Sequence, residues 1–245
     1  MADITKNLNN VWCDLWKVFG TYGSWKSDIP KCKDIQARLL HFNNSHSNDP
    51  EHIDDVVQSL SRGFYLIKSG LEWCEPTAGH NSIDKLNATH KARGAQWRLV
   101  MTYGGFETFA KTLLTKKTKK GLSPNEFNQF TQKCQLNSYK PLYSPNKTKF
   151  KTLEKWLTIK SEREAILDFL SLNDGDTKII QRWLIEKQNI SSWVDALKLS
   201  KALRNATAHG ALSATKVQQW GLRKPLLTLS ENLGEVAVAG IQKLI

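Results

Sequence analysis

The stretch KARGAQWRLVMTYGGFETFAKTLL, residues 91–114, carries the clearest structural signal in the chain. Apolar side chains recur in it at alternating steps of three and four residues: Ala95, Leu99, Tyr103, Phe106, Ala110 and Leu113. An α-helix repeats every 3.6 residues, so this spacing places them along one helix face. The pair Gly104–Gly105 lies within the pattern, and such a pair is typical of close approach by another backbone. We therefore predict a helix over 91–114 with one buried stripe.

Capping signals and helical spacing recur along the rest of the chain. Ser123-Pro124-Asn125-Glu126 fits a capping box, the segment from Ser192 to Asp195 resembles one, and Asn48-Asp49-Pro50-Glu51 is typical of a helix start. Further helices are predicted over 192–209, stopping at Gly210, and over 225–244. Shorter ones are expected near 3–19, 30–42, 50–69, 124–134, 148–171 and 175–188. No alternating pattern predicts a strand, so we expect an all-α helical bundle.

The organisation into domains is less sharply marked. A length of 245 residues fits one large domain or two small ones. Two stretches with proline and polar residues, 70–87 and 137–148, are expected to be loops. The first of them is a candidate boundary. We expect residues 1–90 to form an N-terminal helical extension packed on the core, and residues 91–245 to form a helical domain with a basic insertion around 116–155.

The net charge of +12 is unevenly distributed. Residues 1–70 carry eight basic and eight acidic side chains, whereas residues 111–155 carry 11 lysines and two acids. The second segment thus holds +9 of the +12. A concentrated positive charge favours binding to a phosphate backbone, although a lysine-rich solvated surface is the alternative interpretation.

Several kinds of chemistry lack their motifs. The sequence contains no GxxxxGK[ST], GxGxxG after a strand, HExxH, CxxC or GxSxG, so we expect no metal and no organic cofactor. HSNDPEHIDD, residues 46–55, could hold a divalent cation or be a solvated helix start. The four cysteines lie far apart, and neither a signal peptide nor a membrane-length apolar run is recognisable. We expect a cytoplasmic protein.

The stretch LRNATAHGALS, residues 203–213, combines Arg204 and His209 in otherwise small or apolar surroundings. An imidazole can accept and release a proton near neutral pH, and a guanidinium suits phosphate oxygens. RNA offers such a pair both a phosphodiester and an adjacent 2′-hydroxyl. A histidine that caps a helix and an arginine on the surface would give the same residue pattern.

The spacing restricts how the two side chains meet. Five residues on a straight helix correspond to about 140° of rotation and about 7.5 Å of rise. Asn205 and His209, four apart, share a face, but Arg204 does not. Three arrangements remain open: the long side chain of Arg204 reaches around, the helix loosens before Gly210, or a second copy completes the site.

The pattern Arg204-Asn205-x-x-x-His209 resembles the R-[polar]-x(4–6)-H motif of the HEPN superfamily of small all-helical domains. The following GALSATKVQQWGL and the helix around Tyr103–Phe109 are also similar to that superfamily. Together the resemblance covers about 91–120 and 192–245. It implies a HEPN-like helical bundle with additional N-terminal helices.

The resemblance also implies an activity: a metal-independent endoribonuclease that leaves 2′,3′-cyclic phosphate and 5′-hydroxyl ends. His209 would be the general acid or base, Arg204 would hold the phosphate, Asn205 would orient His209 or bind a phosphate oxygen, and Glu107 would position Arg204 or His209. It implies a homodimer, acting as a toxin or antiviral defence effector with an antitoxin or another defence protein as possible partner.

The basic segment mixes cations with rings, which suits RNA whose bases are unpaired. The residues expected to bind RNA are Lys116, Lys117, Lys119, Lys120, Tyr139, Lys140, Tyr143, Lys147, Lys149 and Lys151. Two other functions stay open. The chain could be a non-catalytic RNA-binding or dimerisation module in a larger complex, or a helical adaptor that docks an acidic protein.

Overall fold

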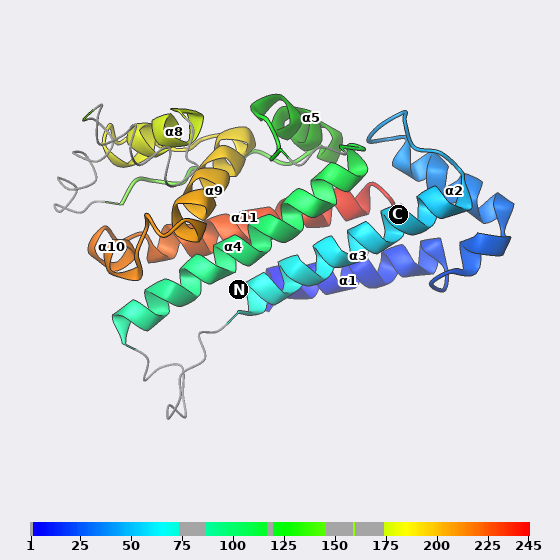
Figure 1. Cartoon of the computed structure of the whole chain (residues 1–245), viewed down its shortest axis with the longest axis horizontal. Helices are drawn as coiled ribbons and strands as arrows, with labels where there is room; N and C mark the ends of the chain where they lie inside the picture. Colours follow the sequence, from blue (N-terminus) through cyan, green and yellow to red (C-terminus); the bar gives the residue numbers. More distant parts are fainter. Residues whose placement is uncertain (1, 74–86, 117–119, 146–158, 160–173) are drawn as a thin grey trace. The chain divides into compact units, whose positions relative to one another are not determined.

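The computed structural model of the chain describes residues 2–73, 87–116, 120–145, 159 and 174–245 (Figure 1). These residues form α-helices, one short 3-10 helix and an isolated bridge between Leu142 and Ile190, without a β-sheet. The predicted all-α class is confirmed for this part of the chain. The helix expected near 148–171 falls outside the described residues, apart from residue 159.

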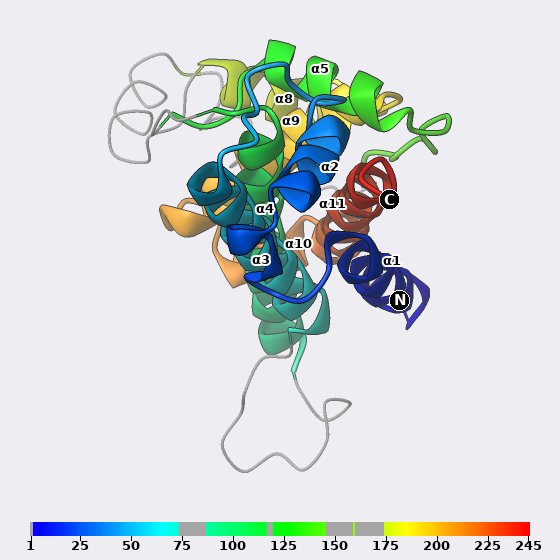
Figure 2. The same cartoon turned by 90° about the vertical axis from the view of Figure 1, so that its right-hand side faces the viewer.

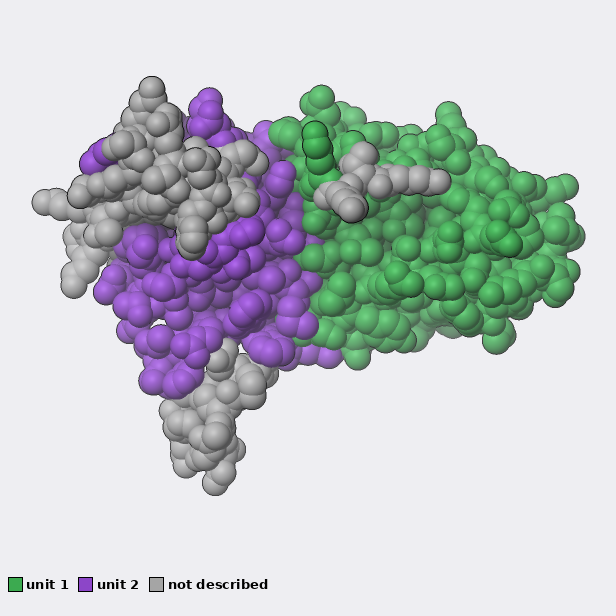
Figure 3. All heavy atoms as spheres, viewed as in Figure 1, with its two compact units in different colours: residues 1–71, 104–137, 231–245 green, residues 72–103, 138–230 purple. Residues whose placement is uncertain are grey.

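The chain forms two compact units, each assembled from separate stretches of sequence (Figure 3). Unit 1 comprises residues 1–71, 104–137 and 231–245, and unit 2 comprises residues 72–103 and 138–230. The division changes units first after residue 71, within the candidate boundary stretch 70–87, and the expected domains 1–90 and 91–245 stay a prediction. It passes through two helices, α4 (Ala88–Leu113) and α11 (Arg223–Gln242), and each of them contributes to both units.

Helix α4 confirms the prediction made for residues 91–114, with a start three residues earlier. All six residues of its apolar stripe are at most 2% exposed. The burial follows from the spacing, because side chains three and four apart on a helix face the same neighbours.

Unit 1 contains most of the N-terminal helices together with the C-terminal part of α4. Its elements are α1 (Ala2–Phe19), the 3-10 helix η1 (Ser24–Ser27), α2 (Ile29–Leu39), α3 (Pro50–Glu72), α5 (Pro124–Cys134) and the end of α11. Figures 1 and 2 show α3 running beside the C-terminal part of α4. Five of these segments begin or end within a few residues of the predicted bounds, whereas η1 was not predicted.

A glycine contact brings α3 and α4 together. A Cβ atom added to Gly105 would lie 2.6 Å from the carbonyl oxygen of Gly63 and 2.6 Å from the backbone nitrogen of Ile67. The same atom added to Gly104 would meet nothing within 4 Å. The predicted close approach of a second backbone is therefore confirmed at Gly105, and Gly104 has no such neighbour.

The capping predictions are largely confirmed. Ser123 and Glu126 form the complete capping box of α5. Ser192 accepts a hydrogen bond from the Asp195 backbone at 3.1 Å, but the Asp195 carboxylate does not complete a box. It binds Arg182 at 2.9 Å and Lys198 at 3.3 Å instead. Aspartate is one methylene shorter than the glutamate of a capping box, and these cations compete for its carboxylate.

Unit 2 contains the candidate Arg–His stretch. Its helices are α8 (Asp174–Leu184), α9 (Trp193–Ala208), α10 (Ala214–Gln219) and the first parts of α4 and α11. Helices α8 and α9 pack against each other (Figure 1). Helix α10 was not predicted; it has only six residues, too few for a periodic pattern, and begins at the Ser213 cap.

None of the helices in the described ranges is both long and apolar enough to cross a membrane.

Candidate functional site

The candidate site lies at the C-terminal end of α9. The helix ends at Ala208, and the backbone nitrogen of His209 still donates to the carbonyl oxygen of Asn205 at 3.0 Å. Gly210 follows with a φ of +79°, a conformation that glycine adopts without steric penalty. The predicted stop at Gly210 is confirmed, and it leaves the His209 side chain exposed at the helix end.

Arg204 and Asn205 belong to a short chain of polar contacts. Nη1 of Arg204 donates to Oδ1 of Asn205 at 2.8 Å, and Nδ2 of Asn205 donates to Oδ2 of Asp176 on α8, also at 2.8 Å. Asp176 is 5% exposed and Asn205 is 8% exposed, so both members are shielded from water. Buried hydrogen bonds that involve a charged group are the stronger kind. The Arg204 side chain is thus held in place by buried neighbours.

An aromatic ring supports the same guanidinium. The central carbon of the Arg204 guanidinium lies 5.6 Å from the centre of the ring of Tyr103, which comes from α4 and is 1% exposed. This distance is within the range of a cation–π interaction. Arg204 is half-buried rather than a freely solvated side chain. The alternative of an ordinary surface arginine does not describe this environment, whereas His209 is the C-cap residue of α9, as the alternative of a helix-capping histidine expected.

The electrostatics of Asp176 reflect two opposing effects. Burial raises the pKa of its carboxyl group above the ordinary value, because a charge is poorly solvated in the interior. The hydrogen bond from Asn205 and the positive charges of Lys201 and Arg204 oppose the rise, but the net pKa stays raised. Perturbed carboxyl groups of this kind are common in functional sites and also occur in structural networks.

His209 takes part in this arrangement only through its backbone. The side-chain amide of Asn205 faces Arg204 and Asp176. The backbone carbonyl oxygen of Asn205 accepts the hydrogen bond from the backbone nitrogen of His209. The exposed imidazole has no hydrogen-bonding partner among the described residues. The arrangement therefore offers a positioned cation and a solvent-accessible proton carrier on the same helix end.

Glu107 belongs to α4 within unit 1, whereas Arg204 and His209 belong to unit 2. Its carboxylate accepts a hydrogen bond from the Leu122 backbone at 3.2 Å and pairs with Lys111 at 3.6 Å. These contacts make it part of the packing of its own unit, and only 16% of its side chain is exposed. Its role in positioning Arg204 or His209 remains a prediction.

The residues expected to bind RNA fall into three groups. In unit 1, Lys120 is exposed, and Lys116 forms an ion pair with Glu126. In unit 2, Lys140 is exposed, Tyr143 is 68% exposed, and Tyr139 packs edge-on against Trp193 at 5.0 Å. The remaining five lie outside the described residues: Lys117, Lys119, Lys147, Lys149 and Lys151.

The stretch 46–55 forms a structured helix start in unit 1. His46 is 2% exposed, and its Nε2 lies 2.9 Å from the Leu113 carbonyl oxygen. Its Nδ1 lies 3.2 Å from Nε2 of His52. Among the described residues, no group of three or more histidine, cysteine or acidic side chains is placed to hold a metal ion.

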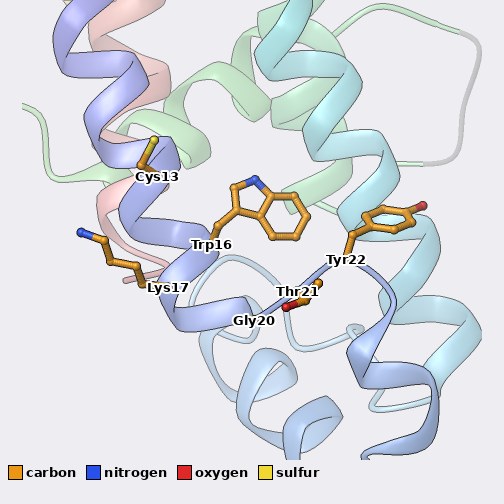
Figure 4. Close-up of a pocket in the computed structure, with 6 residues that line it drawn as sticks. All are labelled: Cys13, Trp16, Lys17, Gly20, Thr21 and Tyr22. Atoms are coloured by element: carbon orange, nitrogen blue, oxygen red, sulfur yellow. The ribbon is translucent and has the colours of Figure 1, made fainter.

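A hollow in unit 1 was not foreseen. It has a volume of about 530 Å³ and is lined by Cys13, Trp16, Lys17, Gly20, Thr21 and Tyr22. Figure 4 shows the rings of Trp16 and Tyr22 beside this hollow, and their centres are 6.3 Å apart. Lys17 extends away from both rings and pairs with Asp14 at 2.7 Å. The lining contains no acid or histidine that could transfer a proton.

Asp176 is the member of this chain of polar contacts that the sequence interpretation missed. It is separated from Asn205 by 29 positions, and no motif connects the two. A signal was nevertheless present, because Asp176 falls on the apolar stripe of α8 together with Ile179, Ile180 and Trp183. An acidic residue on an apolar stripe is buried and needs a hydrogen-bonding partner, so this position indicates a polar contact with another element.

The comparisons with known proteins do not identify a relative. No family model matches the chain, and neither curated proteins nor solved structures gave a match.

Proposed function

We propose that this chain is a metal-independent endoribonuclease of the HEPN type. The observation that carries the proposal is the end of α9, where Arg204 is held by Asn205 and Tyr103 and His209 is exposed five residues later. A fixed guanidinium is suited to a phosphodiester, and an exposed imidazole is suited to proton transfer.

In the proposed reaction, a base removes the proton of an RNA 2′-hydroxyl, and its oxygen attacks the adjacent phosphorus. The bond from phosphorus to the 5′-oxygen breaks, and that oxygen takes up a proton. The products are a 2′,3′-cyclic phosphate and a 5′-hydroxyl. His209 acts as the base or as the acid, and Arg204 stabilises the negative charge that develops on the phosphate oxygens.

The basic segment supports an RNA substrate because it concentrates charge and exposes a ring. Lys120, Lys140 and Tyr143 are the exposed members of the expected RNA-binding set within the described residues. Exposed lysines can pair with phosphates, and an exposed tyrosine can stack on a base. We further propose a homodimer in the cytoplasm, acting as a toxin or defence effector that an antitoxin or another defence protein restrains.

The test is RNA cleavage in the presence of EDTA. Wild-type protein is expected to cut total RNA and to leave cyclic phosphate ends, whereas His209→Ala and Arg204→Ala are expected to lose at least 100-fold in rate, the range for general acid–base groups and charge-stabilising donors. Expression of the wild type, but not of His209→Ala, is expected to arrest growth.

Two matched variants control for unspecific effects. His90→Ala removes another histidine of unit 2, and Arg223→Ala removes an exposed arginine of the same unit. Both are expected to cleave like the wild type. Salt-dependent RNA binding without cleavage, equal in all five proteins, would instead favour the non-catalytic RNA-binding module.

A further inference from the structure

The hydrogen bonds around Arg204 run in one direction. A carboxylate accepts hydrogen bonds and donates none, whereas a guanidinium donates and accepts none. The Asn205 amide lies between these two groups and has one end of each kind. Its NH2 group must face Asp176, so its oxygen must face Arg204. If the amide were reversed, its oxygen would face the Asp176 carboxylate, which also accepts, and its NH2 group would face the Arg204 guanidinium, which also donates.

We propose that Asp176 is a positioning residue that fixes the orientation of the Asn205 amide and, through it, the guanidinium of Arg204. The inference rests on the proposed function, in which Arg204 holds the scissile phosphodiester. Asp176 itself touches neither Arg204 nor RNA in this scheme. It acts from a different helix, α8, and fixes one side of a guanidinium whose central carbon lies over the Tyr103 ring.

The position of Asp176 is difficult to explain by packing. Its neighbours on the helix face, Ile179, Ile180 and Trp183, are buried apolar residues, and an apolar side chain at position 176 would continue their stripe. Burying a carboxylate there is unfavourable unless it is hydrogen-bonded. The structure gives it the amide that binds Arg204 as one hydrogen-bond partner, and the positive charges of Lys201 and Arg204 also favour its charged form.

A favourable interaction with the N-terminus of α8 is the competing explanation. Asp176 lies in the first turn of that helix, where negative charge is stabilised. Asp174 lies in the same turn but is exposed. Its negative charge is therefore stabilised by the same helix N-terminus, without a contact to Asn205. Asp174→Asn is therefore a matched control for substitutions at Asp176.

The first experiment follows the side-chain amide signal of Asn205 and the Nε–H signal of Arg204 by NMR. Asp176→Leu is expected to shift both signals, as Asn205→Ala is expected to shift that of Arg204, whereas Asp174→Asn leaves them in place. Asp176→Asn preserves the volume and one acceptor oxygen, so it is expected to move the Asn205 signal and to leave that of Arg204 nearer its wild-type position. Should Asp176→Leu fail to fold, Asp176→Asn and Asn205→Ala still give the comparison. An Arg204 signal that stays unchanged in a folded Asp176→Leu protein would overturn the inference.

The second experiment measures RNA cleavage in a double-mutant cycle. Asp176→Leu is expected to lower kcat/KM by 10- to 100-fold, on the order of the loss caused by a 1 Å displacement of a binding group. Asp176→Asn is expected to recover part of that loss. In an Asn205→Ala background, Asp176→Leu is expected to add little, since the effect passes through Asn205.

The two experiments separate the inference from the proposed function. A wild-type protein that cuts no RNA removes the proposed function, and the NMR comparison still decides whether Asp176 positions Arg204. A wild-type protein that cuts RNA, with equal cleavage by a folded Asp176→Leu variant, overturns the inference and leaves the proposed function intact.

Discussion

The orientation of two buried side chains in this protein follows from which of their atoms donate hydrogen bonds and which accept them. Asn205 bridges an acceptor and a donor in unit 2, and His46 does the same in unit 1. Nε2 of His46 faces the Leu113 carbonyl oxygen and therefore carries a proton in the neutral ring. Its Nδ1 is then an acceptor, and Nε2 of His52 donates to it.

The environment of His46 predicts a stability change with pH. Burial lowers the pKa of His46 below its ordinary value, and the neighbouring His52 lowers it further, while the bond to Leu113 opposes the change. The unfolded chain then binds more protons than the folded chain below pH about 6.5. Above that pH, His46 is expected to leave the free energy of unfolding unchanged. As the pH drops from about 6.5 to the lowered pKa of the folded state, the free energy of unfolding is expected to fall, by about 1.4 kcal/mol per unit of pKa shift.

Urea denaturation at pH 7.5 and at pH 5.5 measures this effect. His46→Gln keeps a donor for the Leu113 carbonyl oxygen but does not titrate, so its stability is expected to change less between the two pH values. Equal changes in the wild type and in His46→Gln would show that His46 is not the group responsible.

Among the helices, α4 shows how the sequence of one helix determines both its buried face and its contact with a neighbouring helix. Its apolar stripe determines which face is buried, and its glycine pair permits contact with α3. The two glycines are adjacent, yet they face different surroundings because successive residues on a helix are rotated by about 100°. One of them is required by packing and the other is not.

Alanine substitutions at the two positions are therefore expected to have opposite effects. Gly105→Ala would push a methyl group against backbone atoms of α3, which cannot move aside as a flexible side chain would, and is expected to destabilise the protein by about 1–3 kcal/mol. Gly104→Ala meets open space and is expected to stabilise it by up to about 1 kcal/mol, because alanine favours the helix.

Thermal unfolding followed by circular dichroism tests the pair, with each variant serving as the control for the other. A Gly105→Ala protein as stable as the wild type would contradict the contact between α3 and α4.

At the scale of the whole molecule, the proposed site depends on whether one chain supplies all of it. Arg204 lies on α9 and His209 is the residue that follows its last turn, but no described contact joins their side chains. A symmetric dimer would allow the guanidinium of one protomer to work with the imidazole of the other, because a two-fold axis pairs each site residue with its counterpart.

Mixing two inactive variants distinguishes these arrangements. If each site combines Arg204 of one protomer with His209 of the other, a mixture of Arg204→Ala and His209→Ala is expected to regain about a quarter of the wild-type rate, since half of the dimers are mixed and each holds one intact site. Cleavage is measured after the variants have exchanged subunits, and each variant alone is the control. A mixture that stays inactive after confirmed exchange would mean that each site uses residues of a single chain.

The candidate site could be predicted from the sequence only in part. Arg204, Asn205 and His209 were recognisable because they lie close together in the sequence. Their environment was not, since Tyr103 and Asp176 come from α4 and α8. Helix geometry predicted a shared face for Asn205 and His209, but it carries no information about a carboxylate from another helix that binds the Asn205 amide.

The sequence by itself determined the all-α class, the positions of most helices, the capping box at Ser123 and the end of α9 at Gly210. Each of these depends on contacts between residues a few positions apart, which periodicity and capping patterns record. Only the tertiary structure decided that α4 and α11 contribute to two compact units, which of two adjacent glycines contacts a neighbouring helix, and that Asp176 holds Asn205. Those outcomes join residues distant in sequence, and burial of shared surface brings them together only when the whole chain folds.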